Sequence, residues 1–183
     1  MITIMMDAIY HLFDTPSRQT RRLGPGEYLF RRDQKVAALF MVVEGEVQLV
    51  RHQKGGGAII LQRTGPSEIA AEASVFSSRY HCDGVARTGA EIRSVAMREF
   101  LARFRKDPKF AEAWASHLAR EVQNTRLRSE VLSLKTVSER LDAWLEWHGD
   151  MPPRGEWVHL AFQIGVSPEA LYREMTRRRK QCY

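Results

Sequence analysis

Cysteine and long apolar runs are both scarce in this chain of 183 residues. Its two cysteines, Cys82 and Cys182, make neither a disulfide framework nor a closely spaced metal pair, and a reducing compartment is their natural setting. No apolar stretch approaches the roughly 18 residues of a membrane-spanning helix, and the N-terminus lacks the basic and apolar segments of a secretion signal. We therefore expect a cytoplasmic protein that has no membrane partner.

The motifs of common enzyme mechanisms are missing as well. The chain has no P-loop for nucleotide phosphates, no His-Glu-x-x-His zinc motif and no recognisable Ser-His-Asp arrangement. The formal net charge is +6, from 28 basic and 22 acidic residues, which is compatible with nucleic acid but does not require it. The sequence favours a binding function over an enzymatic one.

Short β-type runs fill residues 20–96. The runs are residues 28–30, 39–43, 47–50, 58–61, 85–87 and 92–95, and turns such as Gly24-Pro25-Gly26 separate them. Many short strands with regular turns predict an antiparallel barrel or sandwich. We assign this β domain to residues 1–106 and expect a helix over residues 97–105 at its end.

Glycine and proline are absent from residues 109–134. An unbroken helix from Pro108 to about Leu134 would be about 40 Å long, which exceeds an ordinary globular helix. Side chains at helical spacing form a stripe along it: Phe110, Trp114, Leu118, Val122 and Thr125. The stripe could pack on the chain's own sheet, but a stripe this long more often pairs with a second copy as a parallel coiled coil. Residues 107–134 are therefore predicted to be a dimerisation helix.

A helix-turn-helix is predicted within residues 135–183. An amphipathic helix over residues 137–148 comes first, and a helix over residues 157–164 follows. Gly165 supplies the positive φ that ends this helix, Ser167 is an N-cap, and Pro168 suits the first position of the next helix. A helix, a glycine turn and a capped second helix, in this order, are typical of a DNA-binding motif.

The second helix of this motif carries the side chains expected to contact DNA. Glu169 and Arg173 lie one turn apart, where a carboxylate can accept from cytosine and a guanidinium can read guanine. Five of the eight basic residues after residue 134 fall between Arg173 and Lys180. The predicted DNA-binding residues are Ser167, Glu169, Ala170, Arg173, Arg177, Arg178 and Lys180. An ordinary capped helix with a basic end would also show these features.

Four segments carry a resemblance that covers nearly the whole chain. They are Gly26-Glu27-Tyr28-Leu29-Phe30, the run from Leu39 to Leu49, Glu72-Ala73-Ser74-Val75-Phe76, and the turn and helix from Ile164 to Arg173. In this order and spacing they resemble the CRP/FNR superfamily of bacterial transcription regulators. The resemblance implies an α+β fold with a cupin-like, double-stranded antiparallel β-roll, a long dimerisation helix and a C-terminal helix-turn-helix. It also implies a homodimer on a pseudo-palindromic site in double-stranded DNA, with RNA polymerase as a candidate partner.

The resemblance also bears on the effector. Family members that bind cyclic nucleotides use a Gly-Glu-Leu segment for the ribose and an Arg-Ser pair for the cyclic phosphate. Here Glu72 keeps the acidic position, Ala71 replaces the glycine, and Tyr80-His81 stand at the Arg-Ser position. Without the arginine the phosphate loses a charge-assisted partner, so an effector other than cyclic AMP is expected. The predicted effector-pocket residues are Glu72, Tyr80, His81, Cys82, Thr125 and Arg126, the last two replacing a Thr-Ser pair of cyclic-AMP binders.

His81 and Cys82 suggest a metal or haem as the effector. An imidazole and a thiol side by side suit copper, zinc or an axial position on haem iron. Neighbouring residues of a regular strand point to opposite faces, however, so both could ligate only from a turn or by bridging subunits. The other interpretation is that Cys82 is a small core residue and His81 a polar lining residue. The iron–sulfur mode of the family needs N-terminal cysteines, which this chain lacks.

The end of the chain departs from the family pattern. Family members continue past the recognition helix into a β-hairpin wing that contacts phosphates, whereas this sequence stops at Tyr183, so we expect the wing to be absent. The leading interpretation is a dimeric, sequence-specific DNA-binding transcription regulator whose β-roll senses an effector. The alternative is a ligand-sensing module that acts through protein partners and whose helix-turn-helix is vestigial.

Overall fold

The computed structural model of the protein describes residues 9–14, 20–55 and 57–181. The chain divides into two compact units, unit 1 from Met1 to Leu118 and unit 2 from Ala119 to Tyr183. Helix α3 (Pro108–Ser133) is shared, because its first turns pack in the core of unit 1 and its last turns pack in the core of unit 2. The long helix expected over residues 108–134 is therefore present, but it has no separate core of its own.

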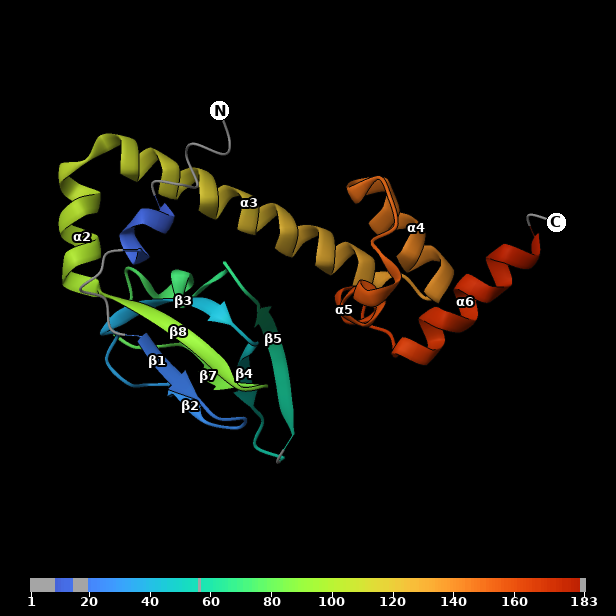
Figure 1. Ribbon diagram of the computed structural model, residues 1–183, viewed down its shortest axis with the longest axis horizontal. Helices are drawn as coiled ribbons and strands as arrows, with labels where there is room; N and C mark the ends of the chain where they lie inside the picture. Colours follow the sequence, from blue (N-terminus) through green and yellow to red (C-terminus); the bar gives the residue numbers. More distant parts are fainter. Residues whose placement is uncertain (1–8, 15–19, 56, 182–183) are drawn as a thin grey trace. The chain divides into compact units, whose positions relative to one another are not determined.

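Two four-stranded antiparallel sheets make up most of unit 1 (Figure 1). One sheet has the strand order β1-β8-β3-β6 and the other has the order β2-β7-β4-β5. The strands are β1 (Thr20–Leu23), β2 (Tyr28–Phe30), β3 (Ala38–Glu44), β4 (Val47–His52), β5 (Ala58–Thr64), β6 (Ile69–Ala70), β7 (Asp83–Ala86) and β8 (Ala90–Ala96). The antiparallel β domain predicted from the sequence is confirmed, and so is the α+β class.

Alternation along the strands builds the core of unit 1. Val47 and Leu49 of β4 are buried at every second position, and so are Ala90 and Ile92 of β8. Because successive side chains of a strand point to opposite faces, each strand turns one apolar row inward. Strands β1 and β6 are additional to the predicted runs.

Helix α2 (Met97–Lys106) and the first turns of α3 add an aromatic cluster to this core. The Phe100 ring meets two rings of α3 edge to face, with its centroid 5.6 Å from that of Phe110 and 4.6 Å from that of Trp114. Phe110 and Trp114 are each 1% exposed, and Leu118 packs against the same cluster. Phe110 and Trp114 are therefore enclosed within unit 1, whereas Leu118 is only partly buried, and the predicted dimer interface along α3 stays a prediction.

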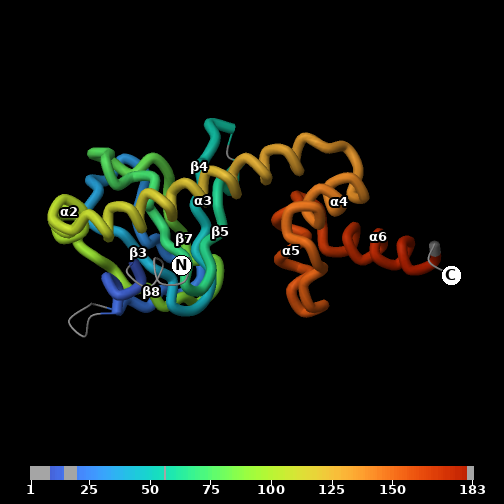
Figure 2. Tube along the Cα trace, turned by 90° about the horizontal axis from the view of Figure 1, so that it is seen from above, coloured from blue at the N-terminus to red at the C-terminus, as the bar shows by residue number. Residues whose placement is uncertain are grey.

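Unit 2 contains the helix-turn-helix. Its helices are α4 (Val137–His148), α5 (Trp157–Gln163) and α6 (Pro168–Gln181), and a short 3-10 turn, η2 (Arg154–Glu156), precedes α5. Leu141, Leu160 and Leu171, one from each helix, join its core and are at most 1% exposed. Figure 2 shows α6 extending away from α5 after the turn. The helices predicted over residues 137–148, over residues 157–164 and from Pro168 onward are confirmed. None of the helices in the described part of the chain has the length and apolar character of a membrane span.

Local chemistry fixes the turn between α5 and α6. Gly165 has a φ of +66°, in the left-handed region that favours glycine at a helix end. The Ser167 hydroxyl accepts a hydrogen bond from the Ala170 N–H at 3.2 Å, and the Ser167 carbonyl accepts one from the Leu171 N–H at 3.1 Å. The glycine turn and the serine N-cap are therefore where the sequence predicted them.

The guanidinium of Arg140 in α4 holds this turn to the end of α3. It donates to the carbonyls of Ile164 at 3.2 Å and Gly165 at 2.9 Å. It also donates to the carbonyls of Leu134 at 2.9 Å and Leu132 at 3.3 Å. All four carbonyls lie at or just beyond the C-terminal ends of α5 and α3, where helical hydrogen bonding leaves oxygens unpaired and the helix dipole is negative. One cation thus satisfies two helix ends.

We expect Gly165→Ala to lower the free energy of unfolding of unit 2 by about 1–2 kcal/mol, because alanine is strained in the left-handed conformation. A Cβ at residue 165 would also meet the end of the Leu132 side chain, which is partly exposed and can rotate away. Gly155→Ala is the matched control, since its Cβ would meet no atom within 4 Å. Urea denaturation followed by tryptophan fluorescence measures both variants. Equal stability of the two would contradict the assignment of strain to residue 165.

Candidate DNA interface and effector site

One face of α6 is exposed and carries charges of both signs. Glu169, Arg173, Thr176 and Lys180 are exposed, and their helical spacing places them in one stripe. We call these four residues the α6 stripe. Three of them were predicted to bind DNA, and the exposed Ser167 lies at the N-terminal end of the stripe. Thr176 was not predicted, because a threonine in a helix gives no signal of its own in the sequence.

The Glu169 carboxylate is kept ionised at the N-terminal end of α6. A hydrogen bond from its own backbone N–H, a second from the Ser167 hydroxyl and the charge of Arg173 lower its pKa. An ionised carboxylate only accepts hydrogen bonds, which matches the amino group that cytosine presents in the major groove. Ala170, which follows Glu169 and was also predicted to bind DNA, is partly buried. The α6 stripe thus presents an acceptor and a guanidinium donor one turn apart.

The other side of α6 carries charges that are engaged inside unit 2. Glu174 is buried, and its carboxylate accepts hydrogen bonds from Arg177 at 2.7 and 2.9 Å and from Arg178 at 2.8 Å. Arg178 also contacts Ser138 and Asp142 of α4. This placement corrects the predicted role of Arg178 as a DNA contact, because the side chain is directed to α4. Arg177 also donates to the Ser138 hydroxyl at 3.3 Å, but its side chain is half exposed, and its DNA contact stays a prediction.

The predicted effector residues of unit 1 gather around a 3-10 turn, η1 (Glu72–Ser74). Glu72 is buried, and Ala71 before it has a φ of +73°. Alanine therefore replaces the glycine of the family pattern, while the backbone keeps a left-handed conformation that glycine would prefer. Strained residues of this kind cluster at ligand sites. The Ser74 hydroxyl and His81 Nδ1 lie 3.2 Å apart and join η1 to the segment before β7.

Tyr80 is a core residue and not a lining residue of this site. It is 3% exposed, and its ring stacks on that of Phe30 with centroids 4.2 Å apart. Its hydroxyl donates to the Ala38 carbonyl at 2.9 Å. Because the ring is enclosed and the hydroxyl is engaged, Tyr80 offers no contact to a ligand. It cannot take the place of the phosphate-binding arginine of cyclic-nucleotide sites.

His81 and Cys82 lie in different environments. Cys82 is 1% exposed, and burial raises the pKa of its thiol to about 11, as is typical of a buried core cysteine. His81 is exposed to solvent on one side, and partial burial followed by the charge of Arg51 lowers its pKa. Among residues 9–14, 20–55 and 57–181, no three or more His, Cys, Asp or Glu side chains are grouped to hold a metal ion. Within these residues His81 and Cys82 are thus not joined by further donors, and the metal or haem site stays a prediction.

Arg51 of β4 is a cation beside this segment that the sequence analysis missed. Its guanidinium donates to the His81 carbonyl at 3.3 Å, although the two residues are 30 positions apart in the chain. The pairing of β4 with β7 brings them together, and no local pattern shows this pairing. Thr125 and Arg126, the remaining residues predicted for the effector pocket, are exposed and belong to unit 2. Their role stays a prediction.

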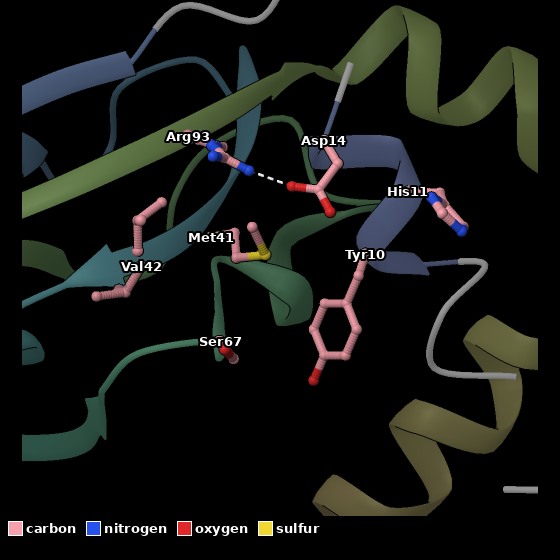
Figure 3. Close-up of a pocket in the computed structure, with 8 residues that line it drawn as sticks. Tyr10, His11, Asp14, Met41, Val42, Ser67 and Arg93 are labelled. Carbon is pink, nitrogen blue, oxygen red and sulfur yellow. Dashed lines mark hydrogen bonds and ion pairs between the residues drawn. The ribbon is translucent and has the colours of Figure 1, made fainter. Parts of the chain in front are cut away.

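A cavity of about 370 Å³ lies in unit 1 with a different lining (Figure 3). Arg93 of β8 forms an ion pair with Asp14 at this cavity, as the dashed line in Figure 3 shows. The lining residues are Tyr10, His11, Asp14, Met41, Val42, Val43, Ser67 and Arg93. None of them is a predicted effector residue, so this cavity is not the site around η1.

The stability of unit 2 should fall as the pH drops from about 5 toward 2. Arg177 and Arg178 hold the pKa of the Glu174 carboxyl far below its usual range, at about 2. A carboxyl whose pKa is lower in the folded state stabilises the fold above its ordinary pKa, and this contribution is lost on protonation. The charged groups around Glu174 are these two arginines and, through Arg178, Asp142 of α4.

Glu174→Gln should reduce the fall in unfolding free energy over this pH range. Part of the fall should remain, because hydrogen bonds from Thr136 also lower the pKa of Glu139. Glu146→Gln removes an exposed carboxylate of α4 and serves as the matched control. Urea denaturation at several pH values measures the slope for each protein. A slope that is the same in both variants would contradict the low pKa of Glu174.

Residues 20–107 match the family model of the cyclic nucleotide-binding domain. The Cyclic AMP receptor protein of Thermus thermophilus is 30% identical over 123 residues, which make up 66% of this chain and 57% of that protein. The chain thus spans little more than half the length of this relative.

Solved structures share the fold. The N-terminal domain of a transcriptional regulator from Streptomyces coelicolor A3(2) is 26% identical, with a TM-score of 0.52, and the match covers 66% of this chain and 83% of that one. FixK2 from Bradyrhizobium japonicum is 17% identical, with a TM-score of 0.67, and the match covers 90% of this chain and 85% of that one. Unit 1 is therefore similar to the cyclic nucleotide-binding domain. The chain is similar in sequence to the Cyclic AMP receptor protein of Thermus thermophilus and in fold to FixK2, and the resemblance predicted from its four segments is confirmed.

Proposed function

We propose that the protein is a cytoplasmic, dimeric regulator of transcription that binds specific DNA sequences and has no enzymatic activity. The observation that carries this proposal is the exposed α6 stripe, which follows a capped turn and holds Glu169 and Arg173 one turn apart. The cyclic nucleotide-binding domain of unit 1 and the similarity of the fold to that of FixK2 support it.

In this proposal the N-terminal half of α6 enters the major groove. Arg173 donates to guanine and Glu169 accepts from cytosine. Ser167 and Lys180, at the two ends of the stripe, contact phosphates, and the exposed part of Arg177 adds a further cation. The base contacts supply the specificity, while the phosphate contacts supply much of the affinity.

Helix α3 is the element that we propose to join two copies. Val122 is 48% exposed, and Thr125, about one turn further along, is exposed as well. These are the residues of the predicted stripe that the core of unit 1 leaves available. Two copies paired through α3 would read two half-sites, about 34 Å apart, of a pseudo-palindromic site. RNA polymerase would be a further partner of such a regulator.

We also propose that unit 1 binds an effector other than cyclic AMP near η1. Glu72 keeps the acidic position, and Arg51 places a cation beside His81. An anionic ligand of nucleotide type is compatible with these groups. The bidentate arginine contact to a cyclic phosphate has no counterpart, because Tyr80 is enclosed in the core. Effector binding would act through α3, which belongs to both units.

A ligand-sensing module that acts through protein partners is the second candidate. Val158 and Phe162, one turn apart on α5, are 44% and 37% exposed, and Trp147 of α4 is 54% exposed. Large apolar side chains exposed on a small helical unit are typical of protein contacts. Sequence-specific DNA binding by the unchanged protein would separate the two candidates.

Arg173→Ala should weaken binding to a site selected from a random DNA library by about 1–3 kcal/mol and relax the base preference at one position. Lys180→Ala is the comparison, and it should weaken binding to specific and nonspecific DNA alike and reduce the salt dependence by about one phosphate contact. Fluorescence anisotropy at several salt concentrations measures both effects. Unchanged discrimination in Arg173→Ala would remove this residue from base recognition. Absence of any preferred site in the unchanged protein would favour the second candidate.

Cyclic AMP should give no micromolar binding signal by isothermal titration calorimetry, because the cyclic phosphate lacks its arginine partner. Arg51→Gln, which removes the cation that contacts the His81 carbonyl, serves as the comparison. A micromolar signal in the unchanged protein that disappears in Arg51→Gln would show that Arg51 supplies the phosphate contact. The proposal of an effector other than cyclic AMP would then be wrong.

A further inference from the structure

Glu174 is an unexpected residue on a helix that is proposed to face DNA. DNA is a dense polyanion, so a carboxylate on the recognition helix opposes binding unless it accepts from a base. Glu174 is only 9% exposed, and its helical position differs from that of Glu169 and Arg173 in the α6 stripe. What it contributes therefore comes from contacts inside unit 2.

Two arginines of α6 enclose this carboxylate. Arg177 donates from Nε and Nη2 to the two oxygens of Glu174, at 2.9 and 2.7 Å. Arg178 donates from Nε to Oε1 of Glu174 at 2.8 Å. Charge-assisted contacts of this kind are short, strong and directional. Glu174 thereby fixes the orientation of both guanidinium groups.

Arg178 extends this cluster to α4. Its Nη1 lies 2.7 Å from Oδ1 of Asp142, and its Nη2 donates to the carbonyl and the hydroxyl of Ser138 at 3.1 and 3.0 Å. With Nε on Glu174, each of its three guanidinium nitrogens has a partner within unit 2, and the side chain is 26% exposed. Arg178 is therefore a bridge from α6 to the first turns of α4.

We propose that Glu174 and Arg178 are positioning residues that fix the placement of α6 on α4 and so make the α6 stripe selective for base sequence. This inference rests on the proposed DNA-binding function. Side chains that recognise a ligand have to be held within about 0.5 Å of the productive geometry. The apolar core of unit 2 holds α6 on α4 without directional preference, whereas the contacts of Arg178 are directional.

A positioning role and an effect of charge alone predict opposite changes in DNA affinity when the Glu174 charge is removed. Removing a negative charge from α6 strengthens binding to every DNA if charge alone decides. If Glu174 positions α6, Glu174→Gln weakens binding to the specific site and leaves nonspecific binding nearly unchanged. Glutamine keeps the size of the side chain, so the substitution removes the charge-assisted contacts and preserves the packing.

The test measures binding of full-length variants to two duplexes by fluorescence anisotropy. One duplex is the site that the unchanged protein selects from a random library, and the other is a shuffled duplex of the same length and composition. The variants are Glu174→Gln, Arg178→Lys and the double variant. Lysine keeps the charge of Arg178 but cannot make its three directed contacts. Asp142→Asn is the matched control, because Asp142 is 59% exposed and Arg178 retains Glu174 and Ser138 without it.

We expect Glu174→Gln and Arg178→Lys to bind the selected site at least about tenfold more weakly, with less than about a threefold change on the shuffled duplex. The salt dependence should stay the same, because no phosphate contact is lost. The double variant should bind the selected site no more weakly than the single variant that binds it more weakly, since the two residues act as one unit. Asp142→Asn should remain within about threefold of the unchanged protein on both duplexes.

Three outcomes would overturn the proposal. Stronger binding of Glu174→Gln to both duplexes would show that charge decides. A loss on both duplexes that matches a loss of folded protein, measured by urea denaturation at the assay temperature, would show a structural role only. Undiminished discrimination in folded Glu174→Gln would remove the positioning role and leave the proposed function intact. If the unchanged protein selects no site at all, the proposed function and this inference fall together.

Discussion

The guanidinium of Arg140 is the interaction on which the arrangement of unit 2 depends. It satisfies carbonyls at two helix ends, those of Leu132 and Leu134 at the end of α3 and those of Ile164 and Gly165 after α5. A carbonyl left unsatisfied away from water costs about 1–3 kcal/mol, and apolar packing cannot replace a donor. Because Arg140 itself belongs to α4, one side chain joins the end of the shared helix to the turn from which α6 begins.

The basic residues of α6 are divided between two tasks, although they follow one another in the chain. Arg173 and Lys180 lie in the exposed α6 stripe, whereas Arg178 binds Glu174 and contacts α4. Net charge therefore overstates how much of this helix is available to a polyanion. In unit 1, too, the position of a residue in the sequence does not give its role. Tyr80 lies in the core, although the family pattern places a ligand contact at this position.

Much of the fold could be predicted because its signals are local. Gly165, Ser167 and Pro168 specify the turn through their own conformations and hydrogen bonds, so the helix boundaries follow from three residues. Strands β1 and β6 show no alternation, because β1 exposes three of its four residues and β6 has only two. The candidate sites were harder to predict because they depend on distant pairing. An apolar stripe does not reveal whether it packs on its own domain or on a second copy, and nothing near Glu174 or Arg51 in the sequence shows which element lies beside them.

The two units also differ in how far along the chain their contacts reach. The packed helices of unit 2 follow one another closely, whereas in unit 1 the first strand pairs with the last, and Thr20 of β1 lies opposite Arg93 of β8. Contacts between distant residues require more chain entropy to be lost before they form, so sheets of this topology fold more slowly than helical units. During synthesis β1 leaves the ribosome before β8, and its pairing partner follows about seventy residues later. We therefore expect unit 2 to fold quickly and unit 1 to limit the folding rate of the whole chain. Until β8 is available, the unpaired β1 is the segment most prone to pair with a wrong strand.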